Sequence, residues 1–176
     1  MLACCAMMAC HRTAPQQPTR RSSETPPSDT TLMALMEVNH CMACEADKIL
    51  ISLADSLTKA TGIEFAQMSC GGWKSRRDSL ARKKGLYADS PKYDESWSVR
   101  LRTFHLDGTL VSDTEGVYKF HHFDLPIAVE EALEDMYTGE KAYVLAPWYT
   151  AYGIHGNQLI AGYENVRFEV TLGERK

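Results

Sequence analysis

The C-terminal half of the chain alternates apolar and polar residues in short runs that are separated by turn residues. In 96–104 nearly every second residue is apolar, which is the period of a strand with one buried face. Asp107 and Gly108 favour a tight turn, and the extended pattern resumes at 109–111. These residues predict a hairpin.

The rest of this half predicts further strands and one helix. Extended runs are expected at 117–123, 141–146 and 163–172. Between the first two, Asp124 and Pro126 are typical of a helix start, apolar residues return at helical spacing, and Gly139 is placed to end the helix. The predicted order is strands, one short helix, strands, which is an α+β arrangement.

The middle of the chain predicts helices. From Thr31 to about residue 61 apolar residues recur at intervals of three and four, as in a long helix with one buried face, and Gly62 is placed to stop it. The more polar stretch 72–84 predicts a second helix that ends at Gly85. Its basic run is expected to form a solvated helix face.

The N-terminus differs in composition from the rest. Residues 1–9 are small and apolar, Cys10 follows, and 11–30 are rich in Pro, Ser, Thr and Gln. The start resembles a bacterial lipoprotein signal, in which small and apolar residues precede a lipid-carrying Cys, although Cys4 and Cys5 compete with Cys10 and no basic n-region is present. The alternative is a disordered tail with incidental cysteines. The polar segment cannot bury enough apolar surface to fold, so we expect a flexible tether.

Length and charge limit the remaining possibilities. We divide the 176 residues into a signal and tether at 1–30, a helical segment at 31–90 and a C-terminal domain at 91–176. The net charge of −4 gives no general attraction to nucleic acid, which we exclude as a partner. No apolar run approaches the roughly 20 residues that span a bilayer, so the expected membrane contact is a lipid anchor.

Cys41 and Cys44 have the spacing of a redox or metal-binding pair, with His40 beside them and Cys70 further along. A redox pair usually lies at a helix N-terminus, whereas this pair falls within the predicted long helix. A zinc site needs a fourth ligand, for which the sequence offers only scattered histidines beyond Cys70. We therefore expect buried or partly buried structural cysteines and no metal.

Three motifs of the C-terminal half occur in a distinctive order. They are Met-Tyr-Thr-Gly-Glu-Lys at 136–141, Ala-Tyr-Gly at 151–153 and Val-Arg-Phe-Glu-Val at 166–170. In this order and spacing the segment from Trp97 to the C-terminus resembles the FKBP family of peptidyl-prolyl cis-trans isomerases. The preceding helix and the Cys-led tether resemble the lipid-anchored relatives of this family in Gram-negative bacteria.

The resemblance implies a fold, an activity and a setting. The fold is a twisted antiparallel sheet wrapped around one short helix and preceded by an N-terminal helical segment. The activity is prolyl isomerisation without a cofactor, on proline-containing or unfolded exported polypeptides. The setting is the periplasm or the outer membrane, with the lipid on Cys10.

The resemblance also implies the site residues. Tyr152 donates its hydroxyl to a substrate carbonyl, Phe168 lines the pocket wall, and Asp113 lies one residue after the position of the family's aspartate. The implied substrate-binding residues are Tyr118, Phe120, Leu125, Pro126, Val129, Ile160, Val111 and Leu101. The alternative for Tyr152 and Phe168 is that they are core aromatics of the same fold.

Several positions depart from the family's pattern. Valine at 129 replaces a tryptophan, Val111 and Ser112 replace phenylalanine and aspartate, Leu101 replaces a tyrosine, and Ile-Ala-Gly at 160–162 replaces Ile-Pro-Pro. Each change removes a family contact. We therefore expect weak isomerase activity, or alternatively a non-catalytic peptide-binding or chaperone module on the same scaffold.

Overall fold

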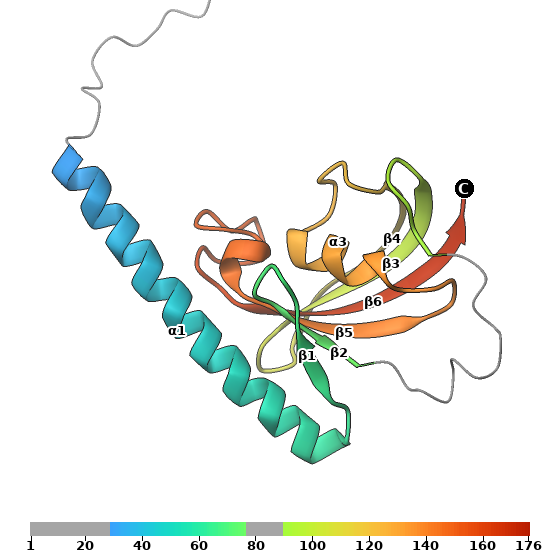
Figure 1. Ribbon diagram of the computed structural model, residues 1–176, viewed down its shortest axis with the longest axis horizontal. Helices are drawn as coiled ribbons and strands as arrows, with labels where there is room; N and C mark the ends of the chain where they lie inside the picture. Colours follow the sequence, from blue (N-terminus) through green and yellow to red (C-terminus); the bar gives the residue numbers. More distant parts are fainter. Residues whose placement is uncertain (1–28, 77–89) are drawn as a thin grey trace, which may run out of the picture.

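The protein is built on a six-stranded antiparallel sheet with the strand order β1-β2-β5-β6-β3-β4 (Figure 1). The computed structural model describes residues 29–76 and 90–176. The strands are β1 (Phe65–Gln67), β2 (Trp73–Ser75), β3 (Ser96–His105), β4 (Leu110–Lys119), β5 (Lys141–Ala146) and β6 (Val166–Arg175). The helices are α1 (Asp29–Thr61), α3 (Ile127–Glu134) and the 3-10 helix η1 (Trp148–Thr150). Neither described range contains a helix of the length and apolarity that a bilayer crossing requires.

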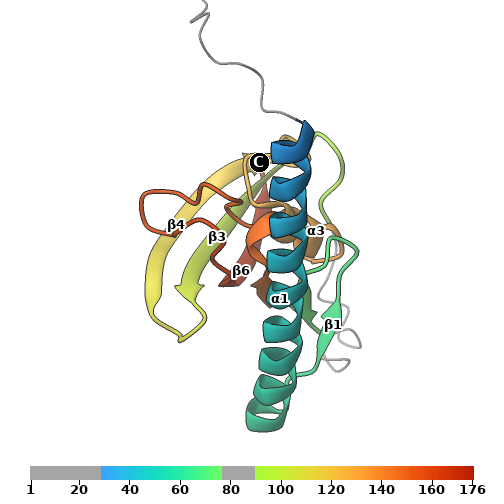
Figure 2. The same ribbon diagram turned by 90° about the vertical axis from the view of Figure 1, so that its left-hand side faces the viewer.

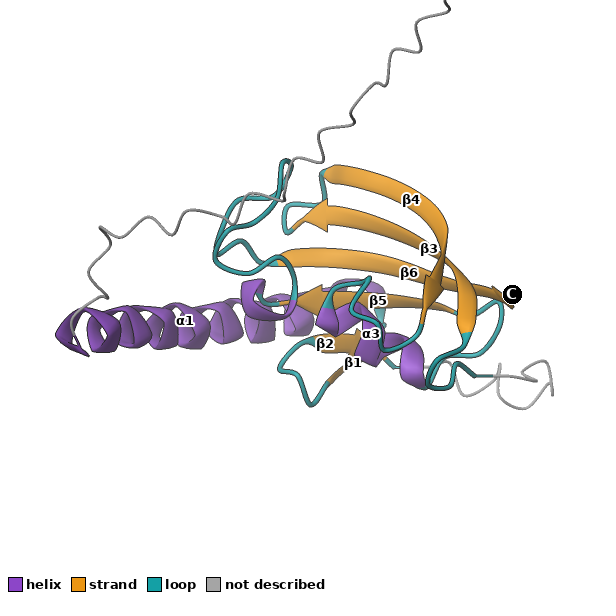
Figure 3. Ribbon diagram, turned by 90° about the horizontal axis from the view of Figure 1, so that it is seen from above, coloured by secondary structure: helices purple, strands orange, loops and turns teal. Residues whose placement is uncertain are grey.

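The two faces of the sheet carry different helices. Along β3, Trp97, Val99 and Leu101 are buried on the face that we call the inner face, while Arg100 and Arg102 lie on the opposite, outer face. The sheet curves around α3, which buries its apolar side in the large inner core (Figures 1 and 3). This arrangement of sheet and short helix is the one that the sequence predicted.

Helix α1 packs on the outer face through a smaller core (Figure 2). Leu50 and Ala54 are buried there against Leu145 of β5. Two hydrogen bonds of 2.7 Å hold other parts of the helix, from the Tyr149 hydroxyl to Asp47 and from the Tyr163 hydroxyl to Asn39. The predicted helix over 31–61 is confirmed, and the structure shows that its central part is the docked part.

Strand β4 is longer than the sequence predicted. The runs 109–111 and 117–123 were expected to be separate, but one strand covers Leu110–Lys119. Among the intervening residues, Asp113 and Gly116 have low strand propensity. Each nevertheless pairs with a residue of β3, and this cross-strand pairing outweighs local preference.

The predicted second helix over 72–84 is wrong where the structure describes it. Residues Trp73–Ser75 form β2, which pairs with β1 on one side and with β5 on the other. The remaining residues from 77 to 84 lie outside the described part. Because β1 and β2 complete the edge of β5, the segment expected to be only helical contributes two strands to the sheet.

Lys74 of β2 joins this edge to α3. Lys74 is 8% exposed. Its ammonium group donates a hydrogen bond of 2.7 Å to the Ala132 carbonyl oxygen and forms an ion pair with Asp135. These groups lie at the C-terminal end of α3, where unpaired carbonyls and the helix dipole favour a cation. Lys74 therefore acts as a C-terminal cap supplied from another element.

Replacing Lys74 with methionine is expected to lower the free energy of unfolding by about 1–3 kcal/mol, because a buried carbonyl loses its charged donor while the apolar stem is retained. Denaturant titration measures the change. Arg76→Met is the control, since the ion pair of Arg76 with Glu64 is exposed and is worth less than about 1 kcal/mol. Equal losses in the two variants would contradict the capping role.

Candidate functional site

Most of the site residues predicted from the sequence lie together on the inner face. The buried members of this inner-face cluster are Leu101, Phe120, Leu125, Val129, Ile160 and Phe168, and the partly buried members are Val111, Tyr118 and Tyr152. They come from three strands, a helix and two loops, one between β4 and α3 and the other between η1 and β6. Pro126 caps the N-terminal end of α3, and its carbonyl oxygen accepts hydrogen bonds from the amides of Val129 and Glu130.

Tyr152 lies beside Phe168 at the edge of the cluster. Their ring centroids are 6.1 Å apart and the rings are tilted by 57°. Phe168 is 0% exposed because β6 alternates and directs it inward, whereas Tyr152 is half-buried in the turn after η1. The next residue, Gly153, has φ +71°, a conformation that favours glycine. No hydrogen bond joins the Tyr152 hydroxyl to another described residue, so it is available to a ligand.

A β-bulge brings Val111 to the cluster. Ser112 pairs with Thr103 but Leu110 pairs with Phe104, so Val111 is an extra residue in β4. It packs against the inner core although its neighbours follow the ordinary alternation. The sequence indicated the residue but not the bulge.

Thr103 is a polar group of this site that the sequence reasoning did not select. It is 1% exposed, lies between Ser112 and Phe168 in the strand register, and its hydroxyl has no hydrogen-bond partner within the described residues. An unpaired buried hydroxyl costs about 1–3 kcal/mol, which a ligand's polar atom would recover. The sequence feature that could have indicated it is the alternation of β3, which places Thr103 on the same face as Val99 and Leu101.

Asp113 does not lie with the other predicted residues. It pairs with Arg102 in the β3–β4 register, and its carboxylate accepts hydrogen bonds of 3.0 and 2.8 Å from Arg100 on the outer face. These hydrogen bonds from Arg100 lower the pKa of the Asp113 carboxyl. Because successive strand residues face opposite sides, the displacement by one residue from Ser112 turns the carboxylate away from the inner-face cluster.

The cysteines are more exposed than expected. Cys41 and Cys44 are exposed, with the Cys44 sulfur 3.8 Å from Nε2 of His40, and Cys70 is partly buried. Burial, followed by the nearby Glu131 carboxylate, raises the pKa of the Cys70 thiol to about 11, so it is protonated at neutral pH. Within 29–76 and 90–176 no cluster of three His, Cys, Asp or Glu side chains is arranged to hold a metal. The lipidation candidate Cys10 lies outside the described residues.

Glu130 of α3 is a buried carboxylate near the cluster. It is 7% exposed, and its Oε1 accepts a hydrogen bond of 3.1 Å from the amide of Phe123. Burial is the main cause that raises its pKa, although the Phe123 amide acts in the opposite direction. The folded protein therefore keeps the Glu130 proton to a higher pH than the unfolded chain does.

Glu130→Gln is expected to stabilise the protein at neutral pH but not at pH 4. Below the unfolded value near 4.5 the wild-type carboxyl is protonated in both states, and stability is lost as the pH rises through the raised folded pKa. Glutamine retains an acceptor for Phe123 and does not ionise. Unfolding free energies of both proteins between pH 4 and 8 test this, and a stability difference that does not grow with pH would refute it.

The comparisons with known proteins identify the fold. No family model matches the chain, and no curated protein matches it. Among solved structures, FkpA from Escherichia coli is 16% identical with a TM-score of 0.60, over 85% of this chain and 73% of that one. A peptidyl-prolyl cis-trans isomerase from Pseudomonas syringae pv. tomato is 20% identical with a TM-score of 0.55, over 75% of this chain and 94% of that one. The chain therefore has the FKBP-like fold of these two structures, with an N-terminal helix before the sheet.

Proposed function

We propose that this chain is an FKBP-type peptidyl-prolyl cis-trans isomerase or foldase of weak activity. The observation that carries the proposal is the pair formed by Tyr152 and Phe168. The Tyr152 hydroxyl has no hydrogen-bond partner among the described residues and lies at the rim of the buried apolar cluster. The ring centroids of Tyr152 and Phe168 are 6.1 Å apart. The FKBP-like fold of the two solved isomerases supports the same reading.

The chemistry requires few functional groups. A barrier of about 18–20 kcal/mol to rotation arises from amide resonance, and no covalent bond to substrate has to form or break. An apolar surface takes the proline ring out of water, and a donor holds a flanking carbonyl while the amide twists. In this chain the inner-face cluster provides the surface and Tyr152 the donor, and no cofactor is needed.

The proposed activity is weak because the family's contacts are incomplete. Val129 stands where the family has tryptophan, and its side chain is smaller, non-aromatic and fully buried. Ser112 stands at the position of the family's aspartate, and the carboxylate of Asp113 is held by Arg100 on the outer face. Both differences reduce the interactions that stabilise a twisted amide.

A protease-coupled assay on a proline peptide tests the proposal. We expect a rate above background that falls about three- to tenfold in Tyr152→Phe, because a hydrogen bond of this kind is worth about 0.5–1.5 kcal/mol. Tyr93→Phe is the matched control, since Tyr93 is 73% exposed and outside the inner-face cluster, and it should leave the rate unchanged. A rate equal to background, and equal in Tyr152→Phe, would overturn the enzymatic proposal.

A second candidate is a non-catalytic peptide-binding or chaperone module on the same scaffold. The outer-face position of Asp113 favours it, because a binding surface does not need that carboxylate. If this candidate is correct, the protein should bind an unfolded, carboxymethylated client protein and the same client with its prolines replaced by alanine with equal affinity. Binding that disappears with the prolines would exclude it.

We also propose that the protein is exported and carries its lipid on Cys10, which would place it in the periplasm or at the outer membrane of a Gram-negative bacterium. The residues before Cys10 and the polar segment after it support this setting. Its partners would be proline-containing or unfolded exported polypeptides. Incorporation of labelled palmitate in cells should be lost in Cys10→Ser and retained in Cys4→Ser; retention in Cys10→Ser would contradict the assignment.

A further inference from the structure

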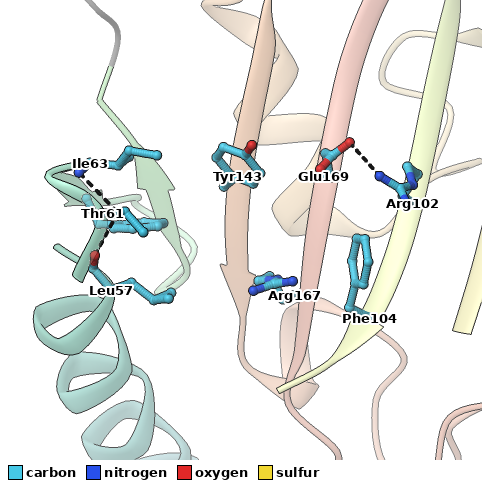
Figure 4. Close-up of a pocket in the computed structure, with 9 residues that line it drawn as sticks. Leu57, Thr61, Ile63, Arg102, Phe104, Tyr143, Arg167 and Glu169 are labelled. Atoms are coloured by element: carbon cyan, nitrogen blue, oxygen red, sulfur yellow. Dashed lines mark hydrogen bonds and ion pairs between the residues drawn. The ribbon is translucent and has the colours of Figure 1, made fainter. Parts of the chain in front are cut away.

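A cavity of about 370 Å³ lies on the outer face of the sheet, at the C-terminal end of α1 (Figure 4). We call it the outer-face pocket. The last turn of α1 and the segment after it form one side, and β3, β5 and β6 form the other. It is separate from the inner-face cluster because its strand residues, such as Tyr143 and Phe104, alternate with the residues that face α3.

The walls of the pocket are mainly apolar. Leu57, Ile63 and Phe65 line the helix side, and Phe104 and Tyr143 line the sheet side. Figure 4 shows Leu57 and Ile63 across the pocket from Tyr143 and Phe104. Aliphatic and aromatic walls with a few polar groups are typical of pockets for small organic ligands.

The charges in the pocket do not cancel. Its charged side chains are Arg102, Arg167 and Glu169. Glu169 is already paired with Arg102 at 3.1 Å and with Lys141 at 2.7 Å, and Arg102 also lies 3.5 Å from Asp113. Arg167 forms no ion pair with any residue of the described ranges. Among the described residues, the pocket therefore presents one guanidinium group without a carboxylate partner.

The Arg167 guanidinium group lies against an aromatic ring. Phe104 and Arg167 are direct partners in the pairing of β3 with β6, and the Arg167 guanidinium carbon lies 4.8 Å from the centroid of the Phe104 ring. This cation–π contact restricts the long side chain, and no residue of 29–76 or 90–176 accepts a hydrogen bond from the Arg167 guanidinium group. A planar guanidinium with free donors matches a carboxylate, which it binds with two parallel hydrogen bonds.

We propose that the outer-face pocket binds a small organic carboxylate with an apolar body. Arg167 would bind the carboxylate, and Leu57, Ile63, Phe65 and Tyr143 would surround the aromatic or aliphatic remainder. The volume is near the lower end of the roughly 300–1,000 Å³ range of small-molecule pockets. A protein partner is disfavoured, because a stable interface buries roughly 1,200–2,000 Å², far more than this pocket offers.

Calorimetric titration of the full chain with 3-phenylpropionate and octanoate tests the proposal, with the corresponding neutral amides as paired ligands. The acids are expected to bind and the amides to bind at least tenfold more weakly, because only the acids pair with Arg167. Arg167→Gln should weaken binding of the acids at least tenfold. Arg100→Gln is the control, since Arg100 is an exposed outer-face arginine that pairs with Asp113 and does not line the pocket.

A second variant covers the case in which Arg167→Gln does not fold. Ile63→Trp fills the pocket from the helix side and should abolish binding of both acids while Arg167 is unchanged. Acids and amides that bind equally, binding that survives both variants, or no binding of either acid at millimolar concentration would overturn the proposal. Isomerase activity of Arg167→Gln should equal that of the wild type, so the outcome here is independent of the function proposed for the inner face.

Discussion

Phe168→Ala is expected to lower the free energy of unfolding by about 3–5 kcal/mol, the largest loss that we predict for a single substitution. Phe168 is 0% exposed at the centre of the inner core. It pairs with Thr103 of β3 and Val144 of β5, so the strands on both sides hold the surrounding backbone in place. A cavity in such a site cannot collapse easily. Most small domains have only about 5–15 kcal/mol of stability in total, so a large fraction would be lost.

Guanidinium titration followed by circular dichroism measures this loss. Phe123→Ala is the matched control, because the same ring is removed from a residue that is 80% exposed, and the expected change is within about 0.5 kcal/mol. Equal effects of the two substitutions would show that Phe168 is not a core residue. Phe168→Leu keeps most of the apolar volume, so a fall in isomerase rate in this variant would report on the ring itself rather than on unfolding.

Leu50→Ala is expected to cost about 2–4 kcal/mol and to act mainly on α1. Leu50 is 0% exposed and packs in the outer core with Ala54 and Leu145. Because α1 contributes nothing to the inner core, its loosening should leave the sheet folded. Hydrogen exchange should therefore become faster in α1 than in β3 and β6.

Ile49→Ala is the control for this experiment. The neighbouring Ile49 is 46% exposed, and alanine is a better helix former, so its loss of stability should stay below about 1 kcal/mol. The hydrogen bonds of Tyr149 and Tyr163 to α1 should keep the helix attached in both variants. Faster exchange throughout the sheet in Leu50→Ala would show instead that α1 and the sheet unfold as one unit.

Much of the fold follows from periodicity that can be read locally. The helix expected over 31–61 is α1, and the strand expected at 141–146 is β5 with the same bounds. The inward series of β3 was also predicted, because a period of two assigns a face to each residue. The strands β1 and β2 were missed, since three-residue strands carry no readable period; here β2 forms by pairing with the edge of β5, and β1 by pairing with β2.

The candidate site was predictable to the extent that its residues belong to alternating strands or to recognisable motifs. Tyr152 and Phe168 were assigned in this way, and the structure brings them together at the inner-face cluster. Asp113 was not predictable by the same means. A β-bulge such as the one at Val111 shifts the strand register by one residue, and the sequence motif does not show this shift. Because a shift of one residue in a strand moves a side chain to the opposite face, the motif could not decide on which face Asp113 lies.

The sequence by itself determined the longer elements, among them α1, β3, α3 and β5, and which side chains are apolar enough to form the inner core, because these depend on local spacing. Only the tertiary structure decided which distant residues meet. Phe104 and Arg167 become neighbours through the pairing of β3 with β6, and Leu57 and Ile63 reach them only because α1 ends beside the outer face. Contacts of this kind depend on strand register and helix docking, which no local pattern specifies.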